Sequence, residues 1–124
     1  PYTKAPSGGP LVQHAYPVLL TAVQQGKTSL EKLVEKACHN PAILFKIQDR
    51  GFLREGYFAD LVLVDLNKKI KVVKEDLLYK CGWSPFEGIT LDATIEKTFV
   101  NGNLVYDRGK IIEIALGKKL TFYR

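Results

Sequence analysis

The sequence predicts an α+β chain in which helices come first and antiparallel strands follow. Up to about residue 50, apolar residues recur at the 3.6-residue spacing of amphipathic helices. Beyond it, short apolar runs rich in Val and Ile alternate with turn residues, as they do in strands. Because no helical pattern separates these runs, we expect an antiparallel sheet, with a helical part over residues 1–50 and a small β-rich part over residues 51–124.

The chain opens with a loop, and an interrupted helix follows. Three prolines and two glycines among the first ten residues disfavour regular structure there. Pro17 lacks a backbone donor, so the first helix should kink or start afresh at this residue. Gly26 should end it. Its predicted apolar face consists of Leu11, Ala15, Val18, Leu19, Ala22 and Val23.

Two shorter helices are expected next. Thr28 and Glu31 have the spacing of a capping box, which predicts a helix start at this point. The apolar face of this helix would consist of Leu30, Leu33, Val34, Ala37 and Cys38. Asn40 and Pro41 should stop it and begin a third helix, with Asn40 as the N-cap and residues 42–47 as the body.

Strands are predicted after Gly56. The Val-rich run at residues 59–65 should form a buried strand, and further strands are expected at residues 70–73 and 94–100. The Asn101-Gly102 pair favours a type I′ hairpin because both residues tolerate positive φ. The chain should return over residues 104–106, turn again at residues 107–109 and end in a strand over residues 111–115.

Composition and charge exclude several classes of protein. No apolar run approaches the roughly 20 residues that span a bilayer, so we expect no membrane partner. Cys38 and Cys81 lie far apart and no apolar signal core opens the chain, which favours a reduced, cytoplasmic protein without a disulfide. The formal net charge is +5, but the basic residues are scattered rather than interleaved with aromatic residues. We therefore expect a solvated surface and no nucleic-acid partner.

Few residues indicate catalytic chemistry. The sequence contains no nucleophile elbow, P-loop or dinucleotide-binding motif. The candidate metal ligands are His14, Cys38, His39 and Cys81. They lack the close pairing of a zinc site, and the adjacent Cys38 and His39 would point about 100° apart on a helix. We expect no catalytic residue and no metal ligand in this segment.

The loop over residues 5–10 is the best candidate binding site. Its glycines let a ligand approach the backbone closely, and the helix N-terminus that follows favours an anion. A plain turn is the alternative. His14 lies just after this loop and would either face a bound ligand or pack as an ordinary histidine.

Six segments resemble the C-terminal portion of dihydroorotases, within the amidohydrolase superfamily. They are Ala5-Pro6-Ser7-Gly8, residues 12–20, Asn40-Pro41-Ala42, residues 56–65, Ser84-Pro85-Phe86-Glu87-Gly88 and residues 98–106. The elements at residues 59–62 and 100–102 are shared by hydantoinases, deacetylases and other amidohydrolases. The segments at residues 5–8 and 84–88 resemble dihydroorotases more narrowly.

The resemblance implies a fold and an activity. Residues 1–50 would be the last helices of a TIM-type (β/α)8 barrel, and residues 51–124 would join a small antiparallel β-sandwich-like domain built from both chain ends. One or two zinc ions would activate a water that opens or closes the cyclic amide between dihydroorotate and N-carbamoyl-L-aspartate, in pyrimidine biosynthesis. The metal ligands and the catalytic Asp would lie upstream of Pro1. The substrate-binding residues that remain would be Ala5, Pro6, Ser7 and Gly8.

Three other interpretations stay open. Many relatives have Gly-Leu-Glu-Thr where this chain has residues 11–14, so the substrate could be another cyclic amide, as in a hydantoinase-like amidase. A dihydroorotase-like chain could instead be a non-catalytic scaffold for a partner enzyme. A small basic nucleic-acid binder would show steeply salt-dependent binding. For the isolated segment we expect no hydrolysis, and for the parent we expect a homo-oligomer.

Overall fold

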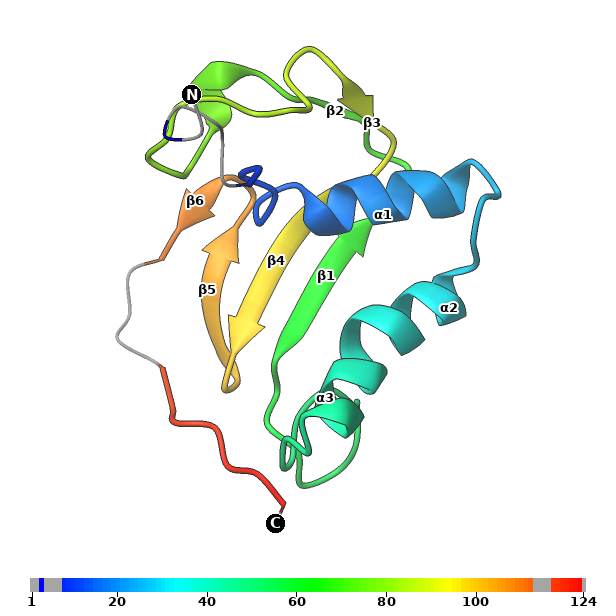
Figure 1. The fold of residues 1–124 in the computed structure, drawn as a ribbon, viewed down its shortest axis with the longest axis vertical. Helices are drawn as coiled ribbons and strands as arrows, with labels where there is room; N and C mark the ends of the chain where they lie inside the picture. The colour runs from blue at the N-terminus through cyan, green and yellow to red at the C-terminus, as the bar shows by residue number, and fades with distance from the viewer. Residues whose placement is uncertain (1–2, 4–7, 113–116, 124) are drawn as a thin grey trace.

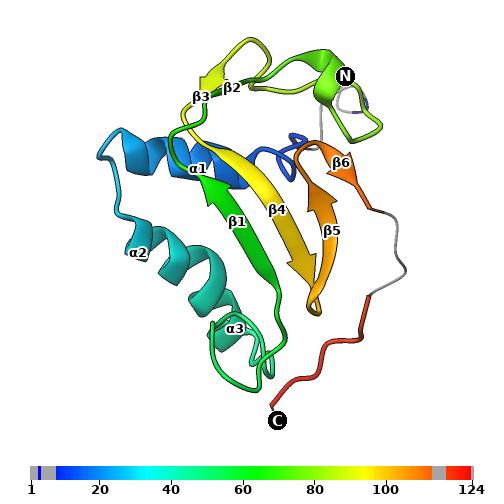
Figure 2. The ribbon, with the colours of Figure 1, turned by 180° about the vertical axis from the view of Figure 1, so that it is seen from behind.

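Helices precede strands in the computed structural model, which describes residue 3, residues 8–112 and residues 117–123. The helices are α1 (Ala15–Gln24), α2 (Leu30–Val34) and α3 (Asn40–Leu44). The strands are β1 (Leu61–Asp65), β2 (Ile70–Lys71), β3 (Thr90–Leu91), β4 (Thr94–Val100), β5 (Asn103–Asp107) and β6 (Lys110–Ile111). The helices lie on one side of the larger sheet (Figures 1 and 2). The predicted order of helices and antiparallel strands is confirmed.

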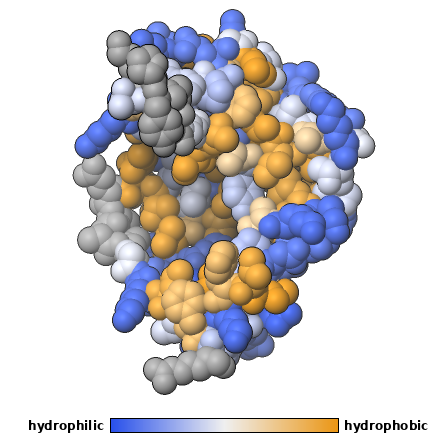
Figure 3. Space-filling view, viewed as in Figure 1, coloured by the Kyte–Doolittle hydropathy of each residue, from blue (hydrophilic) through white to orange (hydrophobic). Residues whose placement is uncertain are grey.

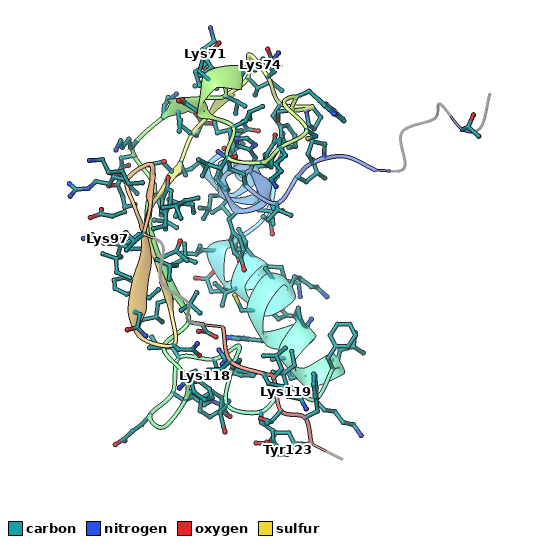
Figure 4. The ribbon with its side chains drawn as sticks, turned by 90° about the vertical axis from the view of Figure 1, so that its left-hand side faces the viewer. Lys71, Lys74, Lys97, Lys118, Lys119 and Tyr123 are labelled. Atoms are coloured by element: carbon teal, nitrogen blue, oxygen red, sulfur yellow. The ribbon has the colours of Figure 1, made fainter. Side chains whose placement is uncertain are left out.

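The larger sheet has the strand order β1-β4-β5-β6, and all its neighbours are antiparallel. Its register aligns Val62, Thr98, Tyr106 and Ile111 in one row across the four strands. The next row contains Lys97, which points away from the helices in Figure 4. Strands β2 and β3 pair separately as a two-stranded sheet.

The turns between β4, β5 and β6 follow the local sequence. Asn101 and Gly102 have φ values of 52° and 83°, which confirms the hairpin that their chemistry predicts. Arg108 and Gly109 also have positive φ and turn the chain into β6. The strand predicted over residues 111–115 is described only in its first residues: β6 covers Lys110–Ile111, and residues 113–116 lie outside the described part. Strand β2 likewise ends at Lys71 rather than at residue 73.

Helix α1 begins at Ala15, two residues before the predicted kink or fresh start at Pro17. Pro17 therefore lies in the first turn, where its missing amide removes no helical hydrogen bond. The predicted apolar face is only partly right, because Val23 packs against the core but the most buried residue, Leu20, was not included in it. Leu11 lies before the helix, and Leu11 and Leu19 are 43% and 42% exposed, whereas Leu20 is 2% exposed. The helix carries apolar residues on more than one side, so periodicity alone could not identify the side that packs against the sheet.

The start of α2 differs from the prediction by one residue. Ser29 is the N-cap, and its hydroxyl oxygen accepts a hydrogen bond from the Lys32 amide at 3.2 Å. The proposed capping box of Thr28 and Glu31 is therefore wrong, because the neighbouring hydroxyl satisfies the free helical amide instead.

Asn40 and Pro41 do not stop the second helix. The chain continues from α2 through a π-helical segment (Glu35–His39) into α3, and the Asn40 amide donates to the Glu35 carbonyl five residues earlier. Proline lacks the amide that an α-helical turn would use, and the wider π turn accommodates this loss. The body of α3 ends at Leu44, not at residue 47.

The core lies where α1 and α2 meet the chain around β4. Its buried members are Leu20, Leu33 and Ala93, with partly buried Tyr16, Val23, Ala37, Val64, Leu66 and Ile95 packed against them. Side chains of α1 also hydrogen-bond to loops of the β part. The Thr21 hydroxyl accepts from the Asp92 amide at 2.9 Å, and the Gln24 amide group donates to the Leu66 carbonyl at 2.6 Å.

Candidate functional site

Most of the predicted substrate loop lies outside the residues that the structure describes. Ala5, Pro6 and Ser7 lie outside the described residues, so their predicted role stays a prediction. Gly8 is described and exposed, and a Cβ added there would meet no atom of the described residues within 4 Å. The described part of the chain therefore leaves the Gly8 backbone accessible, as the loop hypothesis requires.

Gln13 holds the chain just after this loop. Its side-chain Nε2 donates to the Asp76 carbonyl at 2.8 Å, and its Oε1 accepts from the Leu78 amide at 2.8 Å. One side-chain amide thus satisfies a carbonyl and an amide two residues apart, as a neighbouring strand would. These bonds connect the start of α1 to the segment between β2 and β3.

His14 packs in the interior rather than facing an open site. It is 7% exposed, and its ring meets those of Tyr79 and Phe86 edge-on, with both centroids at 6.3 Å. Neither its Nδ1 atom nor the Tyr79 hydroxyl has a hydrogen-bond partner within the described chain. Burial lowers the pKa of His14, because removal from water disfavours the charged ring.

The structure does not bring the candidate metal ligands together. Cys38 Sγ lies 3.5 Å from the Tyr16 hydroxyl, and the His39 ring stacks on Phe52 with a centroid distance of 4.3 Å. Cys81 is exposed, and Cys38 and Cys81 are both free. Over residues 8–112 and 117–123, no three His, Cys, Asp or Glu side chains gather as a metal site would require. These residues do not fit a zinc centre.

An apolar groove separates the helices from the sheet. One part has a volume of about 750 Å³, and it includes the whole sheet row of Val62, Thr98, Tyr106 and Ile111. A second part, of about 770 Å³, extends along α2 and α3 and shares Tyr16, Val62 and Thr98 with the first. Figure 3 shows the hollow at the centre of this face, with mostly apolar walls. We call these two parts together the apolar groove.

The basic side chains are spread over the molecule. Figure 4 shows Lys71 and Lys74 at one end, Lys118 and Lys119 at the other, and Lys97 between them on the far side of the sheet. Five lysines in these places do not form one continuous stripe. Within the part that the structure describes, no helix has the length and apolar character to cross a membrane.

The sequence pattern missed the residues that hold His14. Tyr79 and Phe86 belong to the segment between β2 and β3, where the prediction assigned no role to either ring. The available signal was an aromatic side chain in a segment without helix or strand periodicity. Such a side chain must find a packing partner elsewhere in the chain.

The chain is similar to solved hydantoinases and to several dihydroorotases. The chain is similar to the solved L-hydantoinase (dihydropyrimidinase) from Arthrobacter aurescens, with a TM-score of 0.81 and 34% identity, covering 90% of this chain and 25% of that one. It is 32% identical to a dihydroorotase from Pyrococcus furiosus over 115 residues, or 93% of this chain and 28% of the relative. It is 39% identical to a dihydroorotase from Halobacterium salinarum over 103 residues, or 83% and 24%.

These similarities, together with the arrangement of helices and sheet, show that the chain is part of an amidohydrolase. The sequence model of the amidohydrolase family matches residues 8–105. The chain belongs to the amidohydrolase family. It spans about a quarter of the length of the curated relatives it matches.

Proposed function

We propose that this chain is the C-terminal part of a dihydroorotase-like zinc amidohydrolase, which interconverts N-carbamoyl-L-aspartate and dihydroorotate in pyrimidine biosynthesis. The observation that carries the proposal is identity of 31–39% to several dihydroorotases across most of this chain. The segment Ser84-Pro85-Phe86-Glu87-Gly88 supports the same choice, because it resembles dihydroorotases more narrowly than the rest of the chain does.

We infer that α1 to α3 are the last helices of a (β/α)8 barrel and that residues 51–124 form part of a composite β-sandwich-like domain. The apolar groove supports this division. Val62, Leu78 and Ile111 line it and are 44%, 51% and 59% exposed, and apolar surface of this extent is usually covered by protein. In the parent, other segments of the same protein would cover it.

The part of the active site contributed by this chain would be the loop of Ala5, Pro6, Ser7 and Gly8. Backbone groups of these residues would hold the dihydropyrimidine ring, and the exposed backbone at Gly8 supports access. Because the described residues do not fit a zinc centre, one or two zinc ions would be held by residues outside this chain. We further propose a cytoplasmic homo-oligomer.

A hydantoinase-like amidase is the second candidate function. The L-hydantoinase from Arthrobacter aurescens shares the fold over 90% of this chain at 34% identity, which is within the range of the dihydroorotases. Both candidate functions hydrolyse a ring amide, so they differ in the cyclic substrate that the site accepts.

The two candidate functions are distinguished by measuring which cyclic amide the longer protein that contains this chain hydrolyses. We expect ring opening of dihydroorotate with a kcat/KM well above that for hydantoin, loss of activity after chelation, and recovery with zinc. Preference for hydantoin would favour the second candidate. Absence of turnover on either ring by zinc-loaded protein would contradict both and favour a scaffold. The 124-residue chain alone should show no hydrolysis with added zinc.

A further inference from the structure

The end of the molecule near α3 and the C-terminus exposes large apolar side chains outside both parts of the apolar groove. Six of them come from α3, the turn after it and the C-terminal segment, and their exposed fractions range from 39% to 75%. Figure 3 shows apolar side chains gathered at this end. We call these six residues the tail patch: Ile43, Leu44, Phe45, Leu120, Phe122 and Tyr123.

We propose that the tail patch is the surface on which two copies of this protein associate, with their C-terminal segments side by side across a two-fold axis. This inference rests on the homo-oligomer proposed above and names its interface. It does not depend on the substrate, so a protein that hydrolyses no cyclic amide would leave it unchanged.

Backbone hydrogen bonds join the two halves of the tail patch. The Gln48 amide donates to the Thr121 carbonyl at 2.9 Å, and the Tyr123 amide donates to the Lys46 carbonyl at 2.8 Å. Between these bonds, Phe122 lies opposite Ile47 in an antiparallel bridge. The C-terminal segment is therefore held against the turn after α3, and the tail patch is one surface.

The C-terminal segment also has an open backbone edge at Phe122. The Thr121 carbonyl and the Tyr123 amide are directed at the turn after α3. Because the peptide groups of an extended chain alternate in direction, the amide and carbonyl of Phe122 are directed to the other side, where no described residue bonds to them. Such an edge can pair with another extended segment. A two-fold axis brings the same segment of a second copy to it in the antiparallel direction.

The area of the tail patch is sufficient for a dimer. If a large side chain presents about 150–250 Å², the exposed fractions leave roughly 600 Å² of apolar surface per copy. Homodimer interfaces are only about 65% apolar, so this surface corresponds to an interface of roughly 900 Å² on each copy. Stable specific interfaces bury about 800 Å² per partner.

The charges beside the tail patch decide between occupants. Among the described residues, Lys46, Lys118 and Lys119 are exposed beside it, and Asp49 is an exposed acid in the same turn as Lys46. Figure 4 shows Lys118 and Lys119 at the same end as Tyr123. Three lysines are fewer than the cluster of about four to eight that recognises anionic lipid. In a dimer they stay in water at the rim, where salt screens their mutual repulsion.

The test measures the self-association of the full-length protein that contains this chain by sedimentation velocity. We expect an oligomer that becomes several-fold tighter as sodium chloride rises from about 0.05 to about 0.5 M, because the repulsion between lysines is screened. Phe122→Lys should raise the dissociation constant by about thirtyfold or more, as substitutions at the centre of an interface do. Self-association that salt weakens would indicate an interface of opposite charges and would overturn the assignment.

Ile89→Lys is the matched control. Ile89 is 47% exposed, close to the 52% of Phe122, but it precedes β3 and lies outside the tail patch. We expect this variant to keep the wild-type dissociation constant. Equal weakening by Ile89→Lys and Phe122→Lys would show that added charge disturbs association from any exposed position.

Mixing variants of opposite charge identifies the occupant. If the tail patch faces the tail patch of a second copy, an equimolar mixture of Phe122→Lys and Phe122→Glu should recover the association that each variant loses alone. Recovery would also show that both variants are folded. A tail patch covered by other segments of the same chain, by an acidic protein or by lipid would give no recovery, and that result would overturn the proposal.

The remaining outcomes separate this proposal from the others. A monomeric wild type at high micromolar concentration would overturn both the homo-oligomer and its interface. An oligomer that Phe122→Lys leaves unchanged would overturn the interface alone. Turnover of dihydroorotate by the same wild-type protein decides the proposed hydrolase activity and bears on neither result.

Discussion

The two sides of Tyr16 differ in how completely the chain covers its own apolar residues. On one side, Leu20, Leu33 and Ala93 are 2%, 6% and 0% exposed and form the buried cluster beneath α1 and α2, of which Leu20 and Leu33 line the second part of the apolar groove. On the other side, the first part of the apolar groove leaves Val62 and Ile111 about half exposed. Similar residue types are thus buried in one place and open in the other. Composition indicates how much apolar surface a chain has, and only packing indicates which part needs a partner.

The largest expected effect is at Gly51, where the backbone lies close to Ala42 and Cys38. A Cβ there would lie 2.4 Å from the Ala42 Cβ and 2.8 Å from the Cys38 carbonyl oxygen, and φ is +80°. We expect Gly51→Ala to lower the free energy of unfolding of the purified chain by about 4 kcal/mol, from overpacking and backbone strain together. Urea unfolding measures this change.

Gly56→Ala is the control for Gly51→Ala. Gly56 has nearly the same φ, +82°, but a Cβ there would meet no atom of the described residues within 4 Å. Backbone strain alone should cost about 1 kcal/mol. Equal costs at Gly51 and Gly56 would show that the close approach to Ala42 does not exist.

The second effect compares the two sides directly. Leu20→Ala should cost about 3 kcal/mol, because it opens a cavity in a closed core, whereas Ile111→Ala should cost less than about 1 kcal/mol in the purified chain. The midpoints of urea unfolding report both values. If the groove is covered in the longer protein, Ile111→Ala should become clearly destabilising there; an unchanged small cost would contradict the proposed cover.

A third, smaller effect concerns the connection between the helices and the β4–β5 hairpin. The Arg50 guanidinium forms an ion pair with Asp60, donates to Asn101 Oδ1 at 2.7 Å and lies 4.2 Å from the centroid of the Phe58 ring. Its side chain is 12% exposed. We expect Arg50→Met to lower the free energy of unfolding by about 2 kcal/mol, as the loss of a largely buried charged hydrogen-bonding group does.

Lys32→Met is the control for Arg50→Met. Lys32 pairs with Glu35 at 2.7 Å, but both side chains are about half exposed. Solvent-exposed ion pairs contribute little to stability, so this change should be barely detectable in urea unfolding. A cost for Arg50→Met as small as that for Lys32→Met would mean that Arg50 does not hold the hairpin.

The smallest expected effect is a pH dependence of the free energy of unfolding, caused by Tyr16 at the boundary between the two sides. Burial, together with the hydrogen bond to Cys38 and the nearby charge of its thiolate, raises the pKa of Tyr16 from 10.0 to about 12. Between these two pH values, the unfolded chain loses the Tyr16 proton while the folded chain keeps it. The stability that the Tyr16 proton contributes is therefore fully present below about pH 10, and it is lost as the pH rises towards 12.

The variant Tyr16→Phe isolates this contribution. Its free energy of unfolding should fall less steeply above pH 10 than that of wild type, and the phenolate absorbance of wild type should include one late-titrating tyrosine. Parallel stability profiles in the two proteins would show that Tyr16 titrates near its ordinary pKa. Covering the groove in the longer protein should shift the titration further upward, since burial is its main cause.

Local chemistry made some elements predictable and left others undetermined. The bounds of β4 and the Asn101-Gly102 hairpin follow from residues that are adjacent in the sequence. The buried side of α1 depends instead on contacts of Leu20 with residues around Ala93, which no helical periodicity contains. The packing of His14 on Tyr79 has the same origin, because residues distant in the chain meet there.

The sheet register also implies an order of assembly. Strands β4 and β5 meet across two turn residues, so closing that loop costs little chain entropy, whereas β1 reaches β4 only after residues 66–93 have been looped out. Isolated hairpins form within about 1–10 μs, and long-range pairings are slower. We therefore expect the transition state for folding to contain the β4–β5 hairpin before β1 joins it. Substitutions in the Asn101-Gly102 turn would then slow folding, while substitutions in β1 would mainly accelerate unfolding.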